Sequence, residues 1–376
     1  MAGDNQPTVW PADEHTLAKL KILEEYLKAW MPILSRHAKS RPGSRIVYID
    51  AFAGPGVYEM GEQGSPLVVL ETARRQINLP VPIDIYFIEK DRRRWEHLKQ
   101  TLTSYRSIHS SSRNIVLHDP ILGEAAESVP EILGPPGAQD RPSLVFLDQF
   151  GYSAVPMDLV QYILSSRSSE IFSFMNWREL NRWLSDKTKW PGIDQAFGNK
   201  AWREIIDLSG KDRQSRFLEE YTKSLRETAG ASYSWTFAMH GQDNQLLYWL
   251  IFCSNSDRGL EEMKKAMWKV GSEGSFKFSD KYSGQLELLP GFNQEWLADR
   301  LFQSLQGRAY TVEEVRHFVL TETPCYRYYE ALTLLEKAER LTALGAPRDR
   351  RRGSFGTYLG DSTFQIRLGE QQLRLM

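Results

Sequence analysis

Hydrophobic residues recur at helical spacing over residues 15–38, the first regular pattern in the chain. A repeat of three to four positions places such residues on one face of an α-helix. The pattern stops at the Pro-Gly pair at 42–43, where a helix would break. We therefore expect a helix whose apolar stripe packs on a core and whose lysines form a solvated face. The stripe comprises Leu17, Leu20, Leu23, Leu27, Trp30 and Ile33, and the lysines are Lys19, Lys21 and Lys28.

Short apolar runs then alternate with helix-like segments along the next part of the chain. Such an alternation predicts a parallel sheet with helices on both faces, because each crossover between parallel strands needs a helix. We expect strands at 46–52, 83–89, 114–119 and 143–150, with helices after them at 65–77, 91–104, 122–133 and 156–165.

This α/β pattern ends differently from how it begins. A fifth strand at 170–176 precedes a mostly helical stretch, 177–230, that is typical of an insertion or lid. Apolar runs at 235–241 and 246–254 flank the segment QDNQ and predict a hairpin. A late antiparallel pair that closes an otherwise parallel sheet is the order expected of the class I methyltransferase fold. We therefore predict a Rossmann-like α/β body of this class.

The C-terminal part of the chain follows another pattern. After helices at 258–270 and near 293–305, the sequence from Thr311 predicts a helix, a turn, a longer helix and a basic hairpin. This order is typical of a winged helix. We place the boundary at 306, which gives a Rossmann body over 1–305 and a winged-helix-like domain over 306–376.

Composition excludes several classes of protein. In 376 residues, 47 lysines and arginines balance 48 aspartates and glutamates, so no global field attracts nucleic acid. Cys253 and Cys325 are the two cysteines, which excludes a disulfide framework. The histidines show no HxH or HExxH spacing, so no metal site is predicted. Without a signal-peptide pattern or a run of 18 apolar residues, we expect a cytoplasmic protein that does not cross a membrane.

Candidate chemistry begins with the glycines after the first strand. Glycines let a backbone approach a ligand closely, and the helix that follows presents unpaired N–H groups. The sequence therefore predicts a cofactor loop, although a strand-to-helix turn often needs a glycine for steric reasons alone. The loop residues expected to hold the cofactor are Asp50, Phe52, Ala53, Gly54 and Gly56.

Acidic residues follow the next three strands. Glu89 ends the second strand and can accept from ribose hydroxyls; alternatively, it caps the next helix together with Asp91. Asp119 ends the third strand and can accept from an adenine amino group. Asp148 ends the fourth, at the crevice where ligands bind in such sheets. Each acid alone is explained as a cap or a solvated end, but together they favour a site for S-adenosylmethionine.

The segment Asp148-Gln-Phe-Gly-Tyr152 carries the candidate catalytic residues. Amino-methyltransferases that act on bases place a polar residue, prolines and an aromatic residue here, so that the amine is held while the ring stacks. Both prolines are missing from this chain. We assign Asp148, Phe150 and Tyr152 to the acceptor, with Asp148 orienting it or taking its proton.

Two further groups are candidates for contacts with a substrate or a partner. Asn176, Trp177 and Arg178 end the fifth strand and either line the substrate side or pack the inserted helices. Four arginines lie where the wing would be, although residues 306–376 hold 11 basic and 9 acidic side chains. Winged helices bind nucleic acids and proteins, so DNA, RNA and a protein partner all remain open. These arginines are Arg348, Arg350, Arg351 and Arg352.

Five longer motifs occur across most of the chain: YLKAWMPIL (26–34), YIDAFAGPGVYE (48–59), GSPLVVLE (64–71), FLDQFGYSAVP (146–156) and MKKAMWKV (263–270). Together they resemble the three-Cys-motif partner family, TcmP. The resemblance implies a methyltransferase-like Rossmann body and a partner that resembles a radical S-adenosylmethionine protein with three clustered cysteines. Where the family reads DPFGY, this chain has Gln149, which either restores a polar group near the transferred methyl or marks a site that no longer catalyses.

Three functions follow from these patterns. The first is an S-adenosylmethionine-dependent methyltransferase acting on nucleic acid or a nucleotide-like substrate. The second is a non-catalytic partner that docks substrate or DNA onto a separate enzyme. The third is a nuclease or defence component in which the strand-end acids hold Mg²⁺.

Overall fold

The computed structural model divides the chain into two compact units. One comprises Met1–Ala266 and Lys277–Ser283, and the other comprises Met267–Phe276 and Gly284–Met376. The second unit includes the helix Gln294–Ser304, which precedes the boundary predicted at 306. The residues described are 7–40, 43–76, 78–109, 114–135, 141–149, 151, 155–241, 245–271, 277–279, 293–347 and 349–369.

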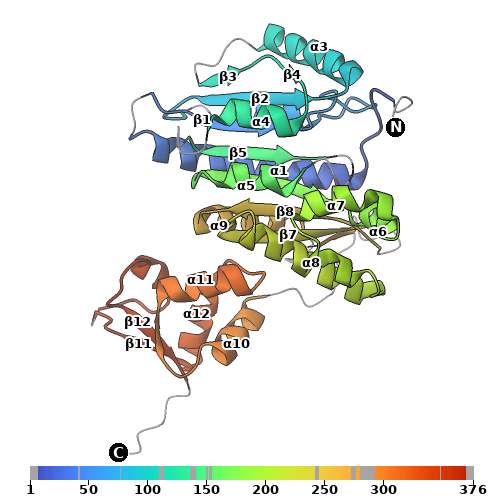
Figure 1. Cartoon of the computed structure of the whole chain (residues 1–376). Coiled ribbons are helices and arrows are strands. Elements are labelled where there is room, and N and C mark those ends of the chain that lie inside the picture. The colour runs from blue at the N-terminus through green and yellow to red at the C-terminus, as the bar shows by residue number, and fades with distance from the viewer. Residues whose placement is uncertain are drawn as a thin grey trace, which may run out of the picture. The chain divides into compact units, whose positions relative to one another are not determined.

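The described strands of the first unit form one mixed sheet (Figure 1). They are β1 (Ile46–Asp50), β2 (Ile83–Glu89), β3 (Ile115–Leu117), β4 (Ile121–Leu122), β5 (Ser143–Leu147), β6 (Ser169–Met175), β7 (Tyr233–His240), β8 (Leu246–Ser254) and β9 (Lys277–Ser279). Their order is β3-β2-β1-β5-β6-β8-β7-β9, with β4 beside β2. The strands from β3 to β6 are parallel, whereas β8 runs antiparallel to β6 and β7. The predicted late antiparallel pair is confirmed, and the fold is a class I methyltransferase-like α/β fold.

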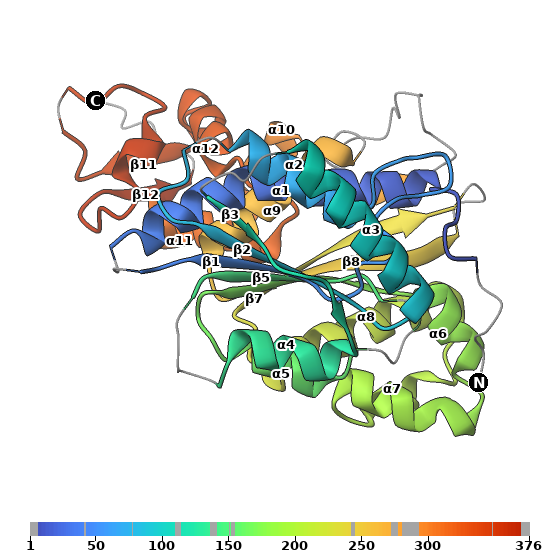
Figure 2. The ribbon, with the colours of Figure 1, turned by 90° about the horizontal axis from the view of Figure 1, so that it is seen from above.

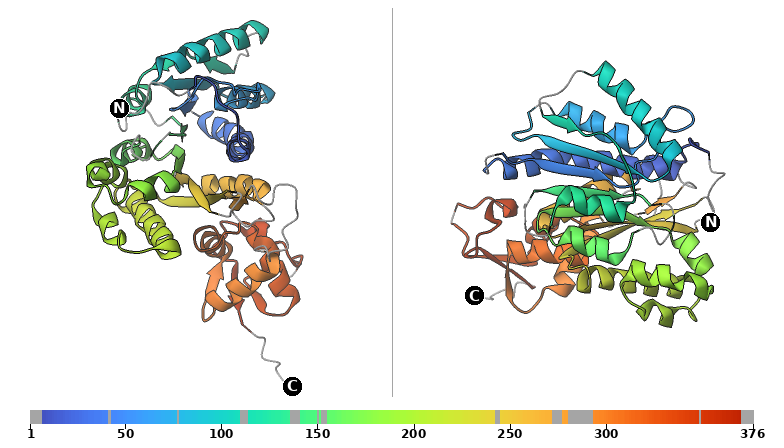
Figure 3. Two further views of the ribbon diagram at one scale, coloured as in Figure 1. Left: turned by 90° about the vertical axis from the view of Figure 1, so that its right-hand side faces the viewer. Right: turned by 45° about the horizontal axis from the view of Figure 1, so that its top comes forward.

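Helices cover both faces of this sheet (Figures 2 and 3). One face carries α1 (Glu14–Ala38), α2 (Ser65–Arg75) and α9 (Asp257–Val270). The opposite face carries α4 (Ala125–Leu133), α5 (Met157–Leu164) and α8 (Gly210–Glu227), while α3 (Arg92–Ile108) follows β2. The predicted insertion is helical and contains α6 (Trp177–Trp183), η1 (Lys187–Lys189), α7 (Trp190–Phe197) and η2 (Ala201–Ile205) ahead of α8.

The first helix, α1, begins directly after its N-cap residue, Asp13, and it packs mostly as its hydrophobic pattern predicts. Asp13 caps α1 by accepting from the Thr16 N–H at 2.7 Å, which satisfies one of the free donors of the first turn. Leu20, Leu23 and Leu27 are buried, but Leu17 at the start of the stripe is 45% exposed. The expected core position of Leu17 is therefore wrong, because the buried side of α1 near its start is formed by His15, Ala18 and Lys19.

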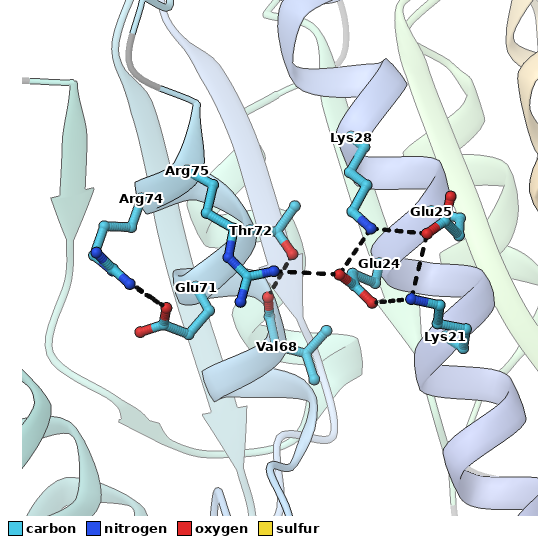
Figure 4. Close-up of polar contacts among 9 residues, drawn as sticks. All are labelled: Lys21, Glu24, Glu25, Lys28, Val68, Glu71, Thr72, Arg74 and Arg75. Carbon is cyan, nitrogen blue, oxygen red and sulfur yellow. Dashed lines mark hydrogen bonds and ion pairs between the residues drawn. The ribbon is translucent and has the colours of Figure 1, made fainter.

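Charged side chains link α1 to α2 on the outer surface (Figure 4). Lys21 and Lys28 both reach Glu24 at 2.8 Å and also contact Glu25, and Arg75 of α2 lies 3.6 Å from Glu24. Such exposed pairs each stabilise a protein by less than about 1 kcal/mol. The expected solvated face is thus confirmed for Lys21 and Lys28.

The second unit has its own core and a small antiparallel sheet. Thr311 and Glu314 form a capping box at the start of α11, which fixes that helix against the preceding strand. The strands are ordered β10-β12-β11, and the elements are α10 (Gln294–Ser304), β10 (Ala309–Thr311), α11 (Val312–Glu322), α12 (Tyr328–Lys337), β11 (Leu341–Leu344), η5 (Phe355–Tyr358) and β12 (Gln365–Leu368). Among the helices of the described residues, none combines the length and the apolar character needed to cross a membrane.

Candidate functional site

A pocket of about 330 Å³ lies at the carboxyl ends of β1, β5 and β6. The chain proceeds from β1 toward β2 on one side of this point and from β5 toward β6 on the other, so the pocket occupies the topological switch point of the sheet. Its walls come from the start of α1, the loop after β1, the residues after β5 and the start of β8. A pocket of this volume is at the lower end of the range for small-molecule sites.

The loop after β1 is preformed, and its glycines are required by its backbone. Gly54 and Gly56 have φ values of 62° and 90°, which side-chain-bearing residues rarely adopt. The N–H of Gly64 donates to the Gly56 carbonyl at 2.9 Å, and a Cβ on Gly64 would lie 2.8 Å from that oxygen. The predicted loop residues Phe52, Ala53, Gly54 and Gly56 all line the pocket.

Asp50 lies beneath this loop and is fully buried. Its Oδ1 accepts from the Phe52 N–H at 3.2 Å, whereas its Oδ2 has no hydrogen-bond partner. Burial, together with the nearby charge of Asp148, raises the pKa of Asp50 to about 7, and the Ser65 hydroxyl opposes this shift. A buried oxygen without a partner is costly in a folded protein, which makes Oδ2 of Asp50 a candidate acceptor beneath the pocket.

Glu89 supports the loop from behind instead of lining the pocket. The residue is 4% exposed, and its Oε2 accepts from the Gly54 N–H at 3.0 Å. Its Oε1 accepts from the Asp91 N–H at 2.8 Å, while Asp91 caps α3 by accepting from the Arg94 N–H at 3.0 Å. These contacts agree with the alternative interpretation, in which Glu89 and Asp91 fix the start of the next helix, and the ribose role of Glu89 stays a prediction.

The structure does not bring Asp119 to the pocket. The predicted third strand is divided into β3 and β4, and Asp119 lies in the connection between them. Its side chain is 84% exposed and accepts from Arg106 at 2.7 Å. The chain turns outward two residues before Asp119, which explains why the strand pattern misplaced this carboxylate.

The pocket lining also contains an ion pair that the sequence pattern did not indicate. Lys19 of α1 is 8% exposed, and its ammonium group donates to the carboxylate of Asp148. The same nitrogen lies 5.7 Å from the centroid of the Phe174 ring. The expectation of a solvated Lys19 is therefore wrong, because this side of α1 faces the pocket and the pair compensates the burial of both charges.

Gln149 presents a free acceptor beside this pair. The residue lines the pocket and is 5% exposed, and its Nε2 donates to the Phe174 carbonyl at 3.2 Å. Its Oε1 is buried and has no hydrogen-bond partner. The predicted acceptor residues Phe150 and Tyr152 lie outside the described residues.

The residues that follow β6 divide between packing and the pocket. Trp177 is 4% exposed, with its ring centroid 5.4 Å from that of Phe217 and 5.5 Å from that of Trp249. Its packing role is therefore confirmed. Asn176 and Arg178 both line the pocket, and Asn176 also caps α6. These two residues have the substrate-side position that the sequence left open.

The N-terminal segment before α1 also contributes to the pocket, which no sequence pattern indicated. Trp10 lines the pocket and lies against the glycine loop, where a Cβ on Gly54 would be 3.7 Å from its ring. Its ring centroid is 6.0 Å from that of Tyr58, and its carbonyl accepts from the Glu59 N–H at 3.0 Å. An aromatic wall of this kind suits a ligand with a flat ring.

The tail arginines differ in their surroundings. Arg350 has a side chain only 5% exposed, and it donates to Glu336 Oε1 at 2.5 Å, so it stabilises the second unit and is not presented to a phosphate. Arg351 and Arg352 are exposed, and Arg348 lies outside the described residues. Within the part of the chain that the structure describes, no group of three or more histidines, cysteines or acids could hold a metal ion.

Comparison with known proteins gives only distant likenesses. No protein-family model and no curated protein matches the sequence. Among solved structures, Trm1 from Pyrococcus horikoshii in complex with S-adenosyl-L-methionine is 11% identical with a TM-score of 0.37, covering 72% of this chain and 62% of that one. This chain thus spans less than two thirds of Trm1. Precorrin-6y C5,15-methyltransferase from Geobacter metallireducens GS-15 is 11% identical with a TM-score of 0.28, and the match covers 67% of this chain and 100% of that one. A methyltransferase from Geobacter sulfurreducens is 12% identical with a TM-score of 0.30, and the match covers 65% of this chain and 81% of that one.

Proposed function

We propose that this protein is an S-adenosylmethionine-dependent methyltransferase that acts on an amino group of a nucleic acid or a nucleotide-like substrate. One observation carries the proposal: the pocket at the switch point is lined both by a preformed glycine loop and by two acceptor side chains, Asp148 and Gln149. A cofactor and an acceptor can therefore meet within one pocket.

The residues of the pocket fit most of this cofactor. The loop offers a close backbone approach, and the unpartnered Oδ2 of Asp50 can accept from the ammonium group of an amino acid. Each Glu89 oxygen accepts from one backbone N–H, and Oε1 also lies 3.4 Å from Arg94 Nε, so the acceptor capacity left for a ribose hydroxyl is mainly on Oε2. Asp119 faces away and contributes nothing here. When bound, the cofactor supplies an electrophilic methyl group on a sulfonium centre.

The chain itself positions the acceptor. Lys19 fixes the Asp148 carboxylate, and Phe174 fixes the Gln149 amide, so the two acceptor groups have set directions. An amino group has two N–H donors and can address both side chains, which would aim its lone pair into the pocket. Asp148 then orients the acceptor or takes its proton.

Titration of the full chain with S-adenosylmethionine and S-adenosylhomocysteine by calorimetry tests the cofactor site. We expect micromolar binding that Asp50→Asn weakens and that the control Asp119→Asn leaves unchanged, because Asp50 lies directly beneath the glycine loop of the pocket whereas Asp119 faces solvent. Transfer of labelled methyl groups to oligonucleotides and nucleotides should fall about 100-fold or more in Asp148→Asn, while cofactor binding persists. The proposal is wrong if the wild-type protein binds neither compound.

A second candidate is a non-catalytic partner that docks substrate or DNA onto a separate enzyme. Two observations support it. Asp119 faces solvent, and both Glu89 oxygens accept from backbone N–H groups, so fewer acidic side chains than expected are available to bind the nucleoside part of the cofactor. The resemblance to the three-Cys-motif partner family suggests the radical S-adenosylmethionine-like neighbour as that enzyme. Co-expression of the two proteins with a tag on this chain tests the docking, and failure to co-purify counts against it.

For the second unit we propose a winged-helix role in binding DNA, RNA or that protein partner. The order α10, β10, α11, α12, β11, β12 and the sheet order β10-β12-β11 support it. Arg351 and Arg352 remain exposed for such contacts, whereas Arg350 is used inside the unit.

A further inference from the structure

The segment from α6 to η1 carries positive charge that its own acids do not neutralise. Residues 177–190 contain four basic and two acidic side chains. Glu179 contacts the Asn176 amide at 3.5 Å, and Asp186 accepts from the backbone and hydroxyl of Thr188 at 2.9 Å and 2.7 Å. Both acids are therefore used to shape the local backbone. The basic residues are Arg178, Arg182, Lys187 and Lys189.

These four cations account for the excess charge of the inserted helices. All four are exposed, and none forms an ion pair with another described residue. On α8, by contrast, Arg216 lies 2.8 Å from Glu219 and Lys223 lies 4.0 Å from Glu227. Residues 191–230 hold seven basic and seven acidic side chains, so the excess charge of the insertion is local to α6 and η1.

The cations begin at the pocket and continue away from it. Arg178 lines the pocket, because α6 starts directly after β6 at the carboxyl edge of the sheet (Figure 1). Arg182 follows one turn later on the same face, since residues four apart are neighbours on a helix. Beyond it, the ammonium group of Lys189 lies 5.4 Å from the ring centroid of the half-buried Trp183. The path therefore combines exposed cations with an aromatic ring.

We propose that this surface, Arg178, Arg182, Trp183, Lys187 and Lys189, binds the phosphate backbone of a single-stranded nucleic acid whose base enters the pocket. Arginine presents a planar fork of donors that matches phosphate oxygens, and its charge releases counterions from the strand. The adjoining pocket has the unpartnered acceptor of Gln149 and the Phe174 ring, which suit a flat base with an amino group. The inference rests on the proposed function and names its substrate class.

Fluorescence anisotropy of the full chain with labelled 20-nucleotide single-stranded DNA and RNA tests this surface. We expect Arg178→Gln/Arg182→Gln to weaken binding about tenfold, the effect of losing two charge-assisted contacts. The slope of log affinity against log salt should fall by about 1.4, because each lost contact with a single strand removes about 0.7. The matched control Arg216→Gln/Lys223→Gln removes the same charge from α8 and should bind like the wild type.

Several results would overturn the inference. They are no binding by the wild-type protein, equal losses in both double variants, or competition by polyglutamate as strong as that by the oligonucleotide, which would indicate an acidic protein partner. Calorimetry with S-adenosylmethionine on the same proteins separates the two proposals. If the oligonucleotide binds but S-adenosylmethionine does not, the phosphate-binding surface is supported and the methyltransferase proposal is refuted. If S-adenosylmethionine binds but the oligonucleotide does not, only the phosphate-binding surface is refuted.

Discussion

Glu170 of β6 is a buried carboxyl group that should make the stability of the protein depend on pH. It is 4% exposed, and it accepts from the Tyr26 hydroxyl at 2.6 Å and the Ser254 hydroxyl at 2.8 Å. Gly259 lies so close that a Cβ there would be 2.0 Å from Oε1. Burial raises the pKa of Glu170 from 4.5 to about 7, against the hydrogen bonds from Tyr26 and Ser254.

The sign follows from linkage between protonation and folding. The folded state binds the proton more tightly than the unfolded state, so the stabilisation is complete below pH 4.5 and is lost as the pH rises through 7. A difference of about 2.5 units at about 1.4 kcal/mol each gives a loss of about 3 kcal/mol by pH 8. Glu170→Gln keeps an acceptor for Tyr26 and can donate to the Ser254 oxygen, but it never ionises. We therefore expect the variant to be more stable than the wild type by about 3 kcal/mol at pH 8, but by less than about 1 kcal/mol at pH 5.

Urea unfolding followed by far-UV circular dichroism at pH 5 and pH 8 measures this difference. Asp50 has a pKa raised in the same direction, so the wild-type curve alone does not isolate Glu170. The difference between wild type and Glu170→Gln removes that background, because Asp50 titrates in both proteins. Glu170→Ala is the control, since it removes the charge and the hydrogen bonds together. The reasoning fails if Glu170→Gln loses the same stability as the wild type between the two pH values.

Three further perturbations have expected outcomes. Lys19→Met leaves the carboxylate of Asp148 unpaired in a mostly buried position and should lower stability by about 2–4 kcal/mol, measured by urea unfolding; an unchanged midpoint would show that water replaces the ammonium group. Arg350→Ala should destabilise the second unit by about 3 kcal/mol, because it strands the buried Glu336, and calorimetric melting should show a lowered transition for that unit. Gly56→Ala should cost about 1–3 kcal/mol through its φ of 90° and should weaken cofactor binding in calorimetry, whereas full retention of both would contradict the role of the loop backbone.

Sequence patterns determined those parts of the protein that depend on neighbours along the chain. The alternation of apolar runs and helices predicted the strands of the sheet, and the late pair of strands predicted the antiparallel closure. Glycine spacing predicted the loop at 50–56, because a positive φ is a local demand of the backbone. The switch point follows from strand order, so the position of the pocket was also predictable.

Tertiary structure alone decided which charged side chains face the pocket. Lys19 and Asp148 are 129 residues apart, and no periodicity shows that one side of α1 meets the end of β5. Strand ends likewise predicted four acids at one edge, but Asp119 turns outward with Arg106 and Glu89 turns back to the loop. A hydrophobic pattern states which residues avoid water. It does not state which partner a polar residue finds when helices and strands distant in the chain pack together, and here that packing makes the site.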